Sequence, residues 1–142
     1  MPKIKKNNDL SMNMALADIK SAEAILKDSQ NTRIPKYMKG LCAYHLQQAA
    51  EKLIKIQIYS TGIPVNNARM YKHALIALLQ YAQSLGITIN IPKYISNNAK
   101  TITDWESLGR YDIHVVVRTD TLNKCLKILN EWYEDLYKDG YR

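Results

Sequence analysis

A group of polar and basic residues within one long amphipathic segment supplies the side chains best suited to chemistry. His45, Gln48 and Lys52 are spaced by three and four residues, so a helix places them on one side. Each residue turns a helix by about 100°, which puts this stripe beside the predicted core stripe and leaves it partly buried. An imidazole, an amide and an ammonium offer mostly hydrogen-bond donors, as a phosphate or nucleobase site requires. The alternative is that His45 and Gln48 bond to a neighbouring helix and only specify packing.

A second candidate group follows Gly109. Arg110 can fork onto a phosphate, and Tyr111 can stack on a base. The alternative is a structural clamp, in which Arg110 caps helix carbonyls and Asp112 holds it in place. The predicted nucleotide-binding residues are therefore His45, Gln48, Lys52, Arg110 and Tyr111.

The sequence predicts no catalytic residue, and Arg69 and His73 are the nearest candidates. They lie four positions apart and would share one face of a helix, but a lone histidine beside an apolar stripe is more often structural. Three histidines and two cysteines without a carboxylate cluster predict neither a metal site nor a cofactor. No Walker loop, dinucleotide-binding fingerprint or legible nucleophile–base pair is present.

The charge distribution favours an anionic ligand. The 142-residue chain has a net charge of +7. Residues 31–100 carry nine basic side chains and one acid, Glu51, whereas residues 1–30 and 101–142 have net charges of +1 and −2. A segment this basic attracts phosphates, although a solvated lysine face would give the same composition.

Apolar residues repeated every three or four positions predict the helices that must position these groups. The expected helices span residues 10–28, 34–59, 67–85, 92–102 and 120–138. The core stripe of the second helix comprises Cys42, Leu46, Ala49, Leu53 and Ile56. Tyr71 is expected in the core stripe of the third. The short β-branched run at 115–117 cannot form a sheet alone, so we expect an all-α, antiparallel up-and-down four-helix bundle with a short additional helix.

Length and composition suit a single cytoplasmic domain. Residues 1–142 are expected to form one unit, with a core over about 10–138 and a basic N-terminal tail over 1–9. No stretch approaches the ~18–20 apolar residues of a membrane span, and polar residues follow the basic start instead of a secretory apolar region. The two cysteines, Cys42 and Cys125, suit a reducing cytosol as small core residues.

The second predicted helix also resembles a known signature. The run HLQQAAEKLIK, from His45 to Lys55, is similar to the second-helix pattern of the HEPN domain (higher eukaryotes and prokaryotes nucleotide-binding domain). Weaker similarities occur at residues 22–23, 72–75, 78–79 and 110–112. The resemblance covers about residues 10–138.

This resemblance implies a helical bundle that usually dimerises through helix faces. Some HEPN domains are metal-independent ribonucleases, many of them toxins, that use an Arg-x4-6-His motif. Others bind nucleotides or act as partners of a minimal nucleotidyltransferase. Here only three residues separate Arg69 from His73, and likewise Arg110 from His114, so the nuclease motif is not present.

The sequence therefore predicts a non-catalytic module that binds a nucleotide or RNA. It is expected to form a homodimer and to pair with a nucleotidyltransferase in a toxin–antitoxin-type system. One alternative is a metal-independent ribonuclease toxin that uses Arg69 and His73. The other is a purely structural dimerisation or assembly module.

Overall fold

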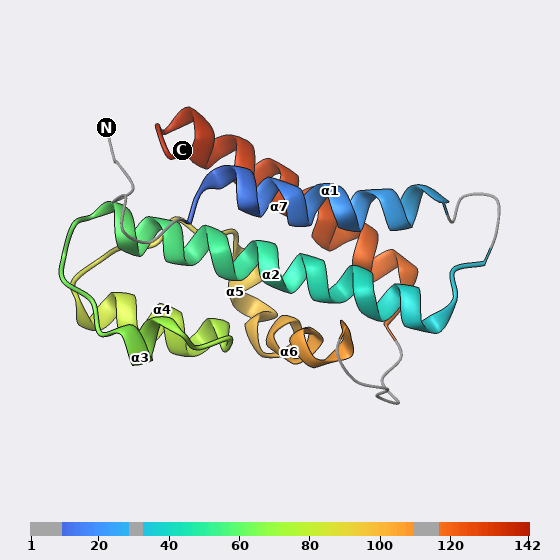
Figure 1. The fold of residues 1–142 in the computed structure, drawn as a ribbon, viewed down its shortest axis with the longest axis horizontal. Coiled ribbons are helices and arrows are strands. Elements are labelled where there is room, and N and C mark those ends of the chain that lie inside the picture. Colours follow the sequence, from blue (N-terminus) through green and yellow to red (C-terminus); the bar gives the residue numbers. More distant parts are fainter. Residues whose placement is uncertain (1–9, 29–32, 110–116) are drawn as a thin grey trace.

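Three long helices dominate the computed structural model, which describes residues 10–28, 33–109 and 117–142 (Figure 1). They are α1 (Met12–Asp28), α2 (Lys36–Ser60) and α7 (Thr119–Lys138). The shorter elements are α3 (Asn67–Met70), α4 (Leu75–Ser84), α5 (Lys93–Asn97), α6 (Ala99–Asp104) and the 3-10 helix η2 (Trp105–Gly109). No strand occurs in the described ranges, so the predicted all-α bundle is confirmed.

Helix α2 lies at the centre of the bundle. In Figure 1, α1 and α7 pack along one side of it, and α4 and α6 lie along the other; η2 also packs against it. Because α2 has neighbours on several sides, 12 of its 25 residues are buried. The predicted stripe is fully buried: Cys42, Leu46, Ala49, Leu53 and Ile56.

The third predicted helix differs from the structure. α3 ends at Met70 and α4 begins only at Leu75, so the expected helix over 67–85 is interrupted. Side chains distant in the sequence form hydrogen bonds with the backbone groups there. Gln47 donates to the His73 carbonyl at 3.0 Å, and the Leu75 N–H donates to the Thr103 hydroxyl at 2.9 Å. These partners lie 26 and 28 residues away, so local periodicity could not reveal the break. Tyr71 is consequently 78% exposed and does not join the core.

The fourth predicted helix is divided at Asn98 into α5 and α6, and η2 continues through residues expected to lie outside helices. η2 packs closely on the start of α2. A Cβ atom added to Gly40 would lie 2.8 Å from the carbonyl oxygen of Leu108, so only glycine fits that contact. Among the described residues, no helix is both long enough and apolar enough to cross a membrane.

Candidate functional site

The predicted donor stripe forms a half-buried surface on α2. This polar strip comprises His45, Gln48, Lys52 and Lys55, and each lies beside the fully buried core stripe. The spacing therefore predicted the position of these side chains correctly. His45, Lys52 and Lys55 each contact one of two carboxylates, one on α1 and one on α2 itself.

The first carboxylate is Asp18 of α1, which is only 9% exposed. Its Oδ1 lies 2.8 Å from His45 Nδ1, and its Oδ2 accepts a hydrogen bond from the Lys52 ammonium. His45, Lys52 and Asp18 form the Asp18 cluster, which joins α1 to α2. For His45, bonding to a neighbouring helix, the alternative given by the sequence, is what the structure shows. Gln48 bonds within α2, donating to Gln47 Oε1 at 2.7 Å.

The second carboxylate is Glu51 of α2, which is 5% exposed. Gln47 donates to its Oε1 at 3.1 Å, Lys55 donates to its Oε2 at 2.8 Å, and His73 Nδ1 lies 3.0 Å from its Oε1. These four residues form the Glu51 cluster. Burial by itself would raise the pKa of Glu51, but the hydrogen bond and charge of Lys55, with the bonds from Gln47 and His73, lower it below its ordinary value.

The structure gives the two nearest catalytic candidates different partners. Because α3 ends at Met70, Arg69 and His73 do not share a face of one continuous helix, and that argument from spacing is wrong. The Arg69 guanidinium lies over the Tyr81 ring, 4.7 Å from its centre. The His73 side chain is 48% exposed; its Nδ1 faces Glu51, and its Nε2 lies 4.0 Å from Glu106.

Both clusters hold a histidine and a lysine against a buried carboxylate. An ammonium has three N–H donors, and Asp18 accepts from the Lys52 ammonium. The polar strip can therefore offer further hydrogen bonds from side chains whose positions are already fixed. With neutral histidines, the Asp18–Lys52 and Glu51–Lys55 pairs each carry no net charge. The described residues contain no group of histidines, cysteines and carboxylates suited to a metal ion.

Arg110 and Tyr111 lie outside the described residues, so their convergence with the polar strip stays a prediction. The chain that leads to them is placed by η2, where Leu108 contacts Gly40. Gly40 precedes Lys52 by twelve residues, which is about 18 Å along a helix.

Asp18 and Gln47 were not predicted as site residues, although the sequence contains a signal for each. Asp18 lies three residues after Ala15 and four before Ala22, so an acid stands at the spacing of the α1 core stripe. Gln47 lies four residues after Ala43 and three before the buried Ala50, at the spacing of a second buried stripe. A polar residue at core spacing indicates a buried hydrogen-bond partner.

A comparison with known proteins identifies the family of this chain. Comparisons with curated proteins and with solved structures give no match. The HEPN domain family model matches residues 10–138, which include the bundle, the polar strip and both clusters. Because this match covers nearly the whole chain, the protein belongs to the HEPN domain family.

Proposed function

We propose that this HEPN domain is a non-catalytic module that binds a nucleotide or RNA through the polar strip of α2. Family membership supports a helical module related to nucleotides or nucleic acids. The observation that carries the proposal is that buried Asp18 and Glu51 fix the Lys52 and Lys55 ammonium donors on one half-buried surface. Donors fixed before binding lose little side-chain entropy when a phosphate arrives.

The surrounding charge supports attraction of a polyanion. Nine basic residues stand against Glu51 between residues 33 and 100. The two cluster lysines are neutralised by carboxylates, but several other cations in this range have no acidic partner among the described residues: Arg33, Lys36, Lys39, Lys72 and Lys93. Their field would raise the local concentration of phosphate-bearing ligands and would weaken with salt.

Titration calorimetry with ATP and with a short single-stranded RNA tests the polar strip. We expect Lys52→Gln and Gln48→Leu each to raise the Kd about tenfold or more, because each removes a side chain that donates a hydrogen bond to the ligand. Lys100→Gln is the matched control, since Lys100 forms an exposed pair with Asp104 on α6. Unchanged affinity in both strip variants would remove the strip from the proposal.

The predicted contribution of Arg110 needs its own measurement. If Arg110 and Lys52 contact one phosphate, Arg110→Gln and Lys52→Gln should be non-additive in binding energy. If Arg110 instead caps a helix, Arg110→Gln should lower the melting temperature without changing the Kd. Circular dichroism melts alongside calorimetry separate these two results.

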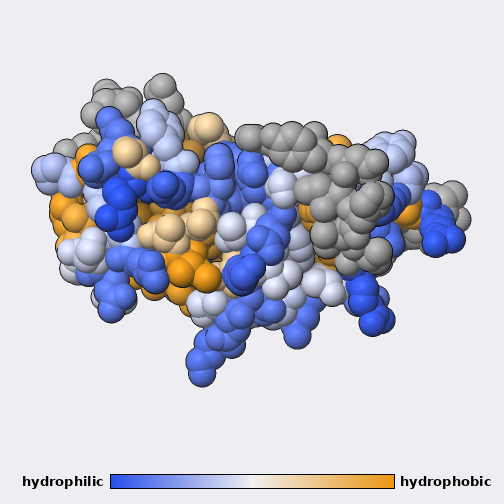
Figure 2. Space-filling model, turned by 90° about the horizontal axis from the view of Figure 1, so that it is seen from below, coloured by the Kyte–Doolittle hydropathy of each residue, from blue (hydrophilic) through white to orange (hydrophobic). Residues whose placement is uncertain are grey.

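We also propose that the module works in the reducing cytoplasm as a homodimer, with a nucleotidyltransferase as a partner. Apolar side chains exposed around α3 and α4 support an assembly surface: Ile63, Tyr71 and Ile76. Figure 2 shows apolar surface at the end of the molecule that carries these elements. Sedimentation of the purified chain tests the dimer, and a monomer at every concentration would contradict it.

The alternative enzymatic function rests on one observation. His73 is half-exposed and faces a buried carboxylate, an arrangement that orients a histidine for proton transfer. If the protein cleaves RNA in the presence of EDTA and His73→Ala does not, the protein is a ribonuclease and the proposal of a non-catalytic module is wrong. Intact RNA after prolonged incubation would exclude cleavage by this residue.

A further inference from the structure

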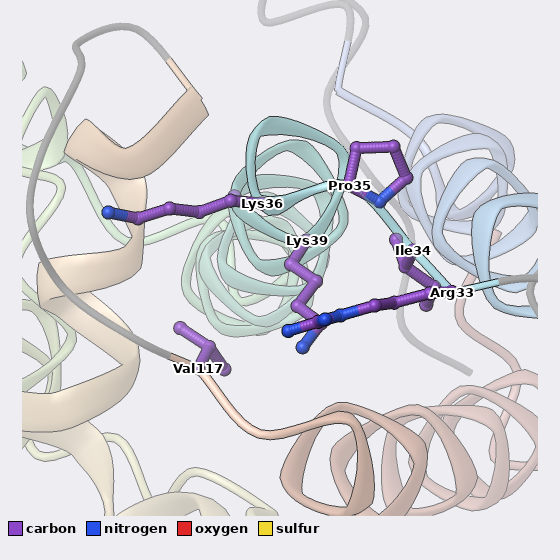
Figure 3. Close-up of a pocket in the computed structure, with 7 residues that line it drawn as sticks. Arg33, Ile34, Pro35, Lys36, Lys39 and Val117 are labelled. Carbon is purple, nitrogen blue, oxygen red and sulfur yellow. The ribbon is translucent and has the colours of Figure 1, made fainter.

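A cavity of about 370 Å³ lies where the start of α2 approaches the chain entering α7 (Figure 3). Its basic lining residues are Arg33, Lys36 and Lys39, and its apolar ones are Ile34, Pro35 and Val117. In Figure 3 the side chains of Arg33 and Lys39 point into the same space, whereas Lys36 extends away from them. The cavity thus combines two convergent cations with an apolar wall.

These cations differ from the lysines of the polar strip because none has an acidic partner in the described part of the chain. Among the described residues, no carboxylate forms an ion pair with Arg33, Lys36 or Lys39. The first turn of α2 also contains no acidic residue. Like charges around one cavity repel each other, and a bound anion would relieve that repulsion.

The shape and the apolar wall narrow the class of anion. A volume of about 370 Å³ is at the small end of ligand pockets, so it suits a small molecule better than a polymer. An arginine fork and an ammonium match phosphate oxygens. Ile34 and Val117 are almost fully buried and offer apolar contact to a planar group.

We propose that this cavity binds a nucleoside monophosphate, with its phosphate on Arg33 and Lys39 and its base against the apolar wall. The site is distinct from the polar strip, because Lys39 precedes His45, the first strip residue, by six residues, about 9 Å along α2, and Lys52 by thirteen, about 20 Å. It goes beyond the proposed function, since it needs neither the strip nor a nucleic-acid polymer.

Titration calorimetry with AMP, adenosine and inorganic phosphate tests this assignment. AMP should bind more tightly than either fragment, because only AMP engages both the cations and the apolar wall. Arg33→Gln and Lys39→Gln should each raise the Kd for AMP at least about tenfold. Lys93→Gln removes the same charge from α5 and should leave the Kd within about twofold.

The strip variants distinguish this inference from the proposed function. AMP binding that survives Lys52→Gln and Gln48→Leu but is lost in Lys39→Gln supports the cavity, whatever the strip does. AMP binding lost in the strip variants but retained in Arg33→Gln and Lys39→Gln would overturn the cavity and leave the strip standing. Phosphate that binds as tightly as AMP, or absence of AMP binding at millimolar concentration, would also overturn it. Cooperative circular dichroism melts confirm that each variant is folded at the temperature of the titration.

Discussion

The middle and the start of α2 carry basic side chains in opposite settings. In the middle, Lys52 and Lys55 each bond to a buried carboxylate, Asp18 or Glu51. At the start, Arg33 and Lys39 line a cavity and have no acidic partner among the described residues. The comparison separates cations held in buried ion pairs from cations that have no carboxylate partner in the described part of the chain.

The energetic consequence is different for the two regions. Removing one partner from a buried ion pair leaves the other charge desolvated and unpaired, which is costly. Removing an unpaired cation leaves no group unsatisfied and relieves like-charge repulsion. Stability measurements should therefore respond to changes in the middle of α2, whereas changes at its start should leave the free energy of unfolding nearly unaltered.

The largest effect is expected from Glu51→Ala. It leaves Gln47, Lys55 and His73 without their shared acceptor, and it should lower the free energy of unfolding by about 3–5 kcal/mol in urea. Asp104→Ala is the control, because Asp104 pairs with Lys100 at an exposed position and should cost little. A loss below about 1 kcal/mol for Glu51→Ala would erase the contrast between the two regions.

Substitutions in the apolar core give a stability loss with which the loss for Glu51→Ala can be compared. Leu53 follows Lys52 on α2, and Leu129 lies on α7; both are fully buried. Leu53→Ala and Leu129→Ala should each cost about 2–5 kcal/mol, because a cavity replaces packed methyl groups. Unchanged urea midpoints would show that these side chains are not in the core.

Lowering the pH should reduce the stability contributed by the middle of α2 and leave the contribution of its start unaffected. The pKa of Glu51 is lowered from 4.5 in the folded protein, so the unfolded state binds more protons between the two values. The stabilisation from ionised Glu51 is present above about pH 4.5 and decreases as the pH falls through the folded pKa.

The variant Glu51→Gln, which cannot ionise, isolates the pH-dependent stabilisation from Glu51. The stability difference between the native protein and Glu51→Gln should shrink as the pH falls below 4.5, whereas the difference for Lys39→Gln should stay constant. Urea unfolding at pH 7, 5, 4 and 3 measures both. A constant difference for Glu51→Gln would contradict the lowered pKa.

A smaller effect is expected at the contact between α2 and η2. Alanine favours a helix over glycine by about 0.5–1 kcal/mol, but a Cβ on Gly40 would meet the Leu108 carbonyl oxygen at 2.8 Å. Overpacking typically costs about 1–3 kcal/mol, so Gly40→Ala should destabilise by about 1 kcal/mol net. A gain in the melting temperature would show that η2 moves away freely.

The smallest effect is expected from Lys39→Gln in the absence of ligand. Because Lys39 has no carboxylate partner among the residues that the structure describes, its loss should change the free energy of unfolding by less than about 0.5 kcal/mol. Lys52→Gln, the matched change in the middle of α2, should cost about 1–3 kcal/mol because Asp18 loses a charged donor. Equal losses for the two variants would contradict the division of α2 into two regions.

The sequence by itself determined the helical class and the phase of the long helices. The three- and four-residue spacing of Cys42, Leu46 and Leu53 was sufficient, because a helix repeats its faces locally. The same rule placed His45, Gln48 and Lys52 beside the core. The run from His45 to Lys55 also carried the family resemblance.

Only the tertiary structure decided which partners these side chains meet. The choice of Asp18 for Lys52, the break before Leu75 and the cavity beside Lys39 each depend on residues far apart in the chain. A spacing rule describes one helix, whereas a hydrogen bond between helices depends on how their packing brings distant residues together. For that reason the donor stripe, and the burial of Asp18, could be predicted from the sequence, but the pairing of each donor with its acceptor could not.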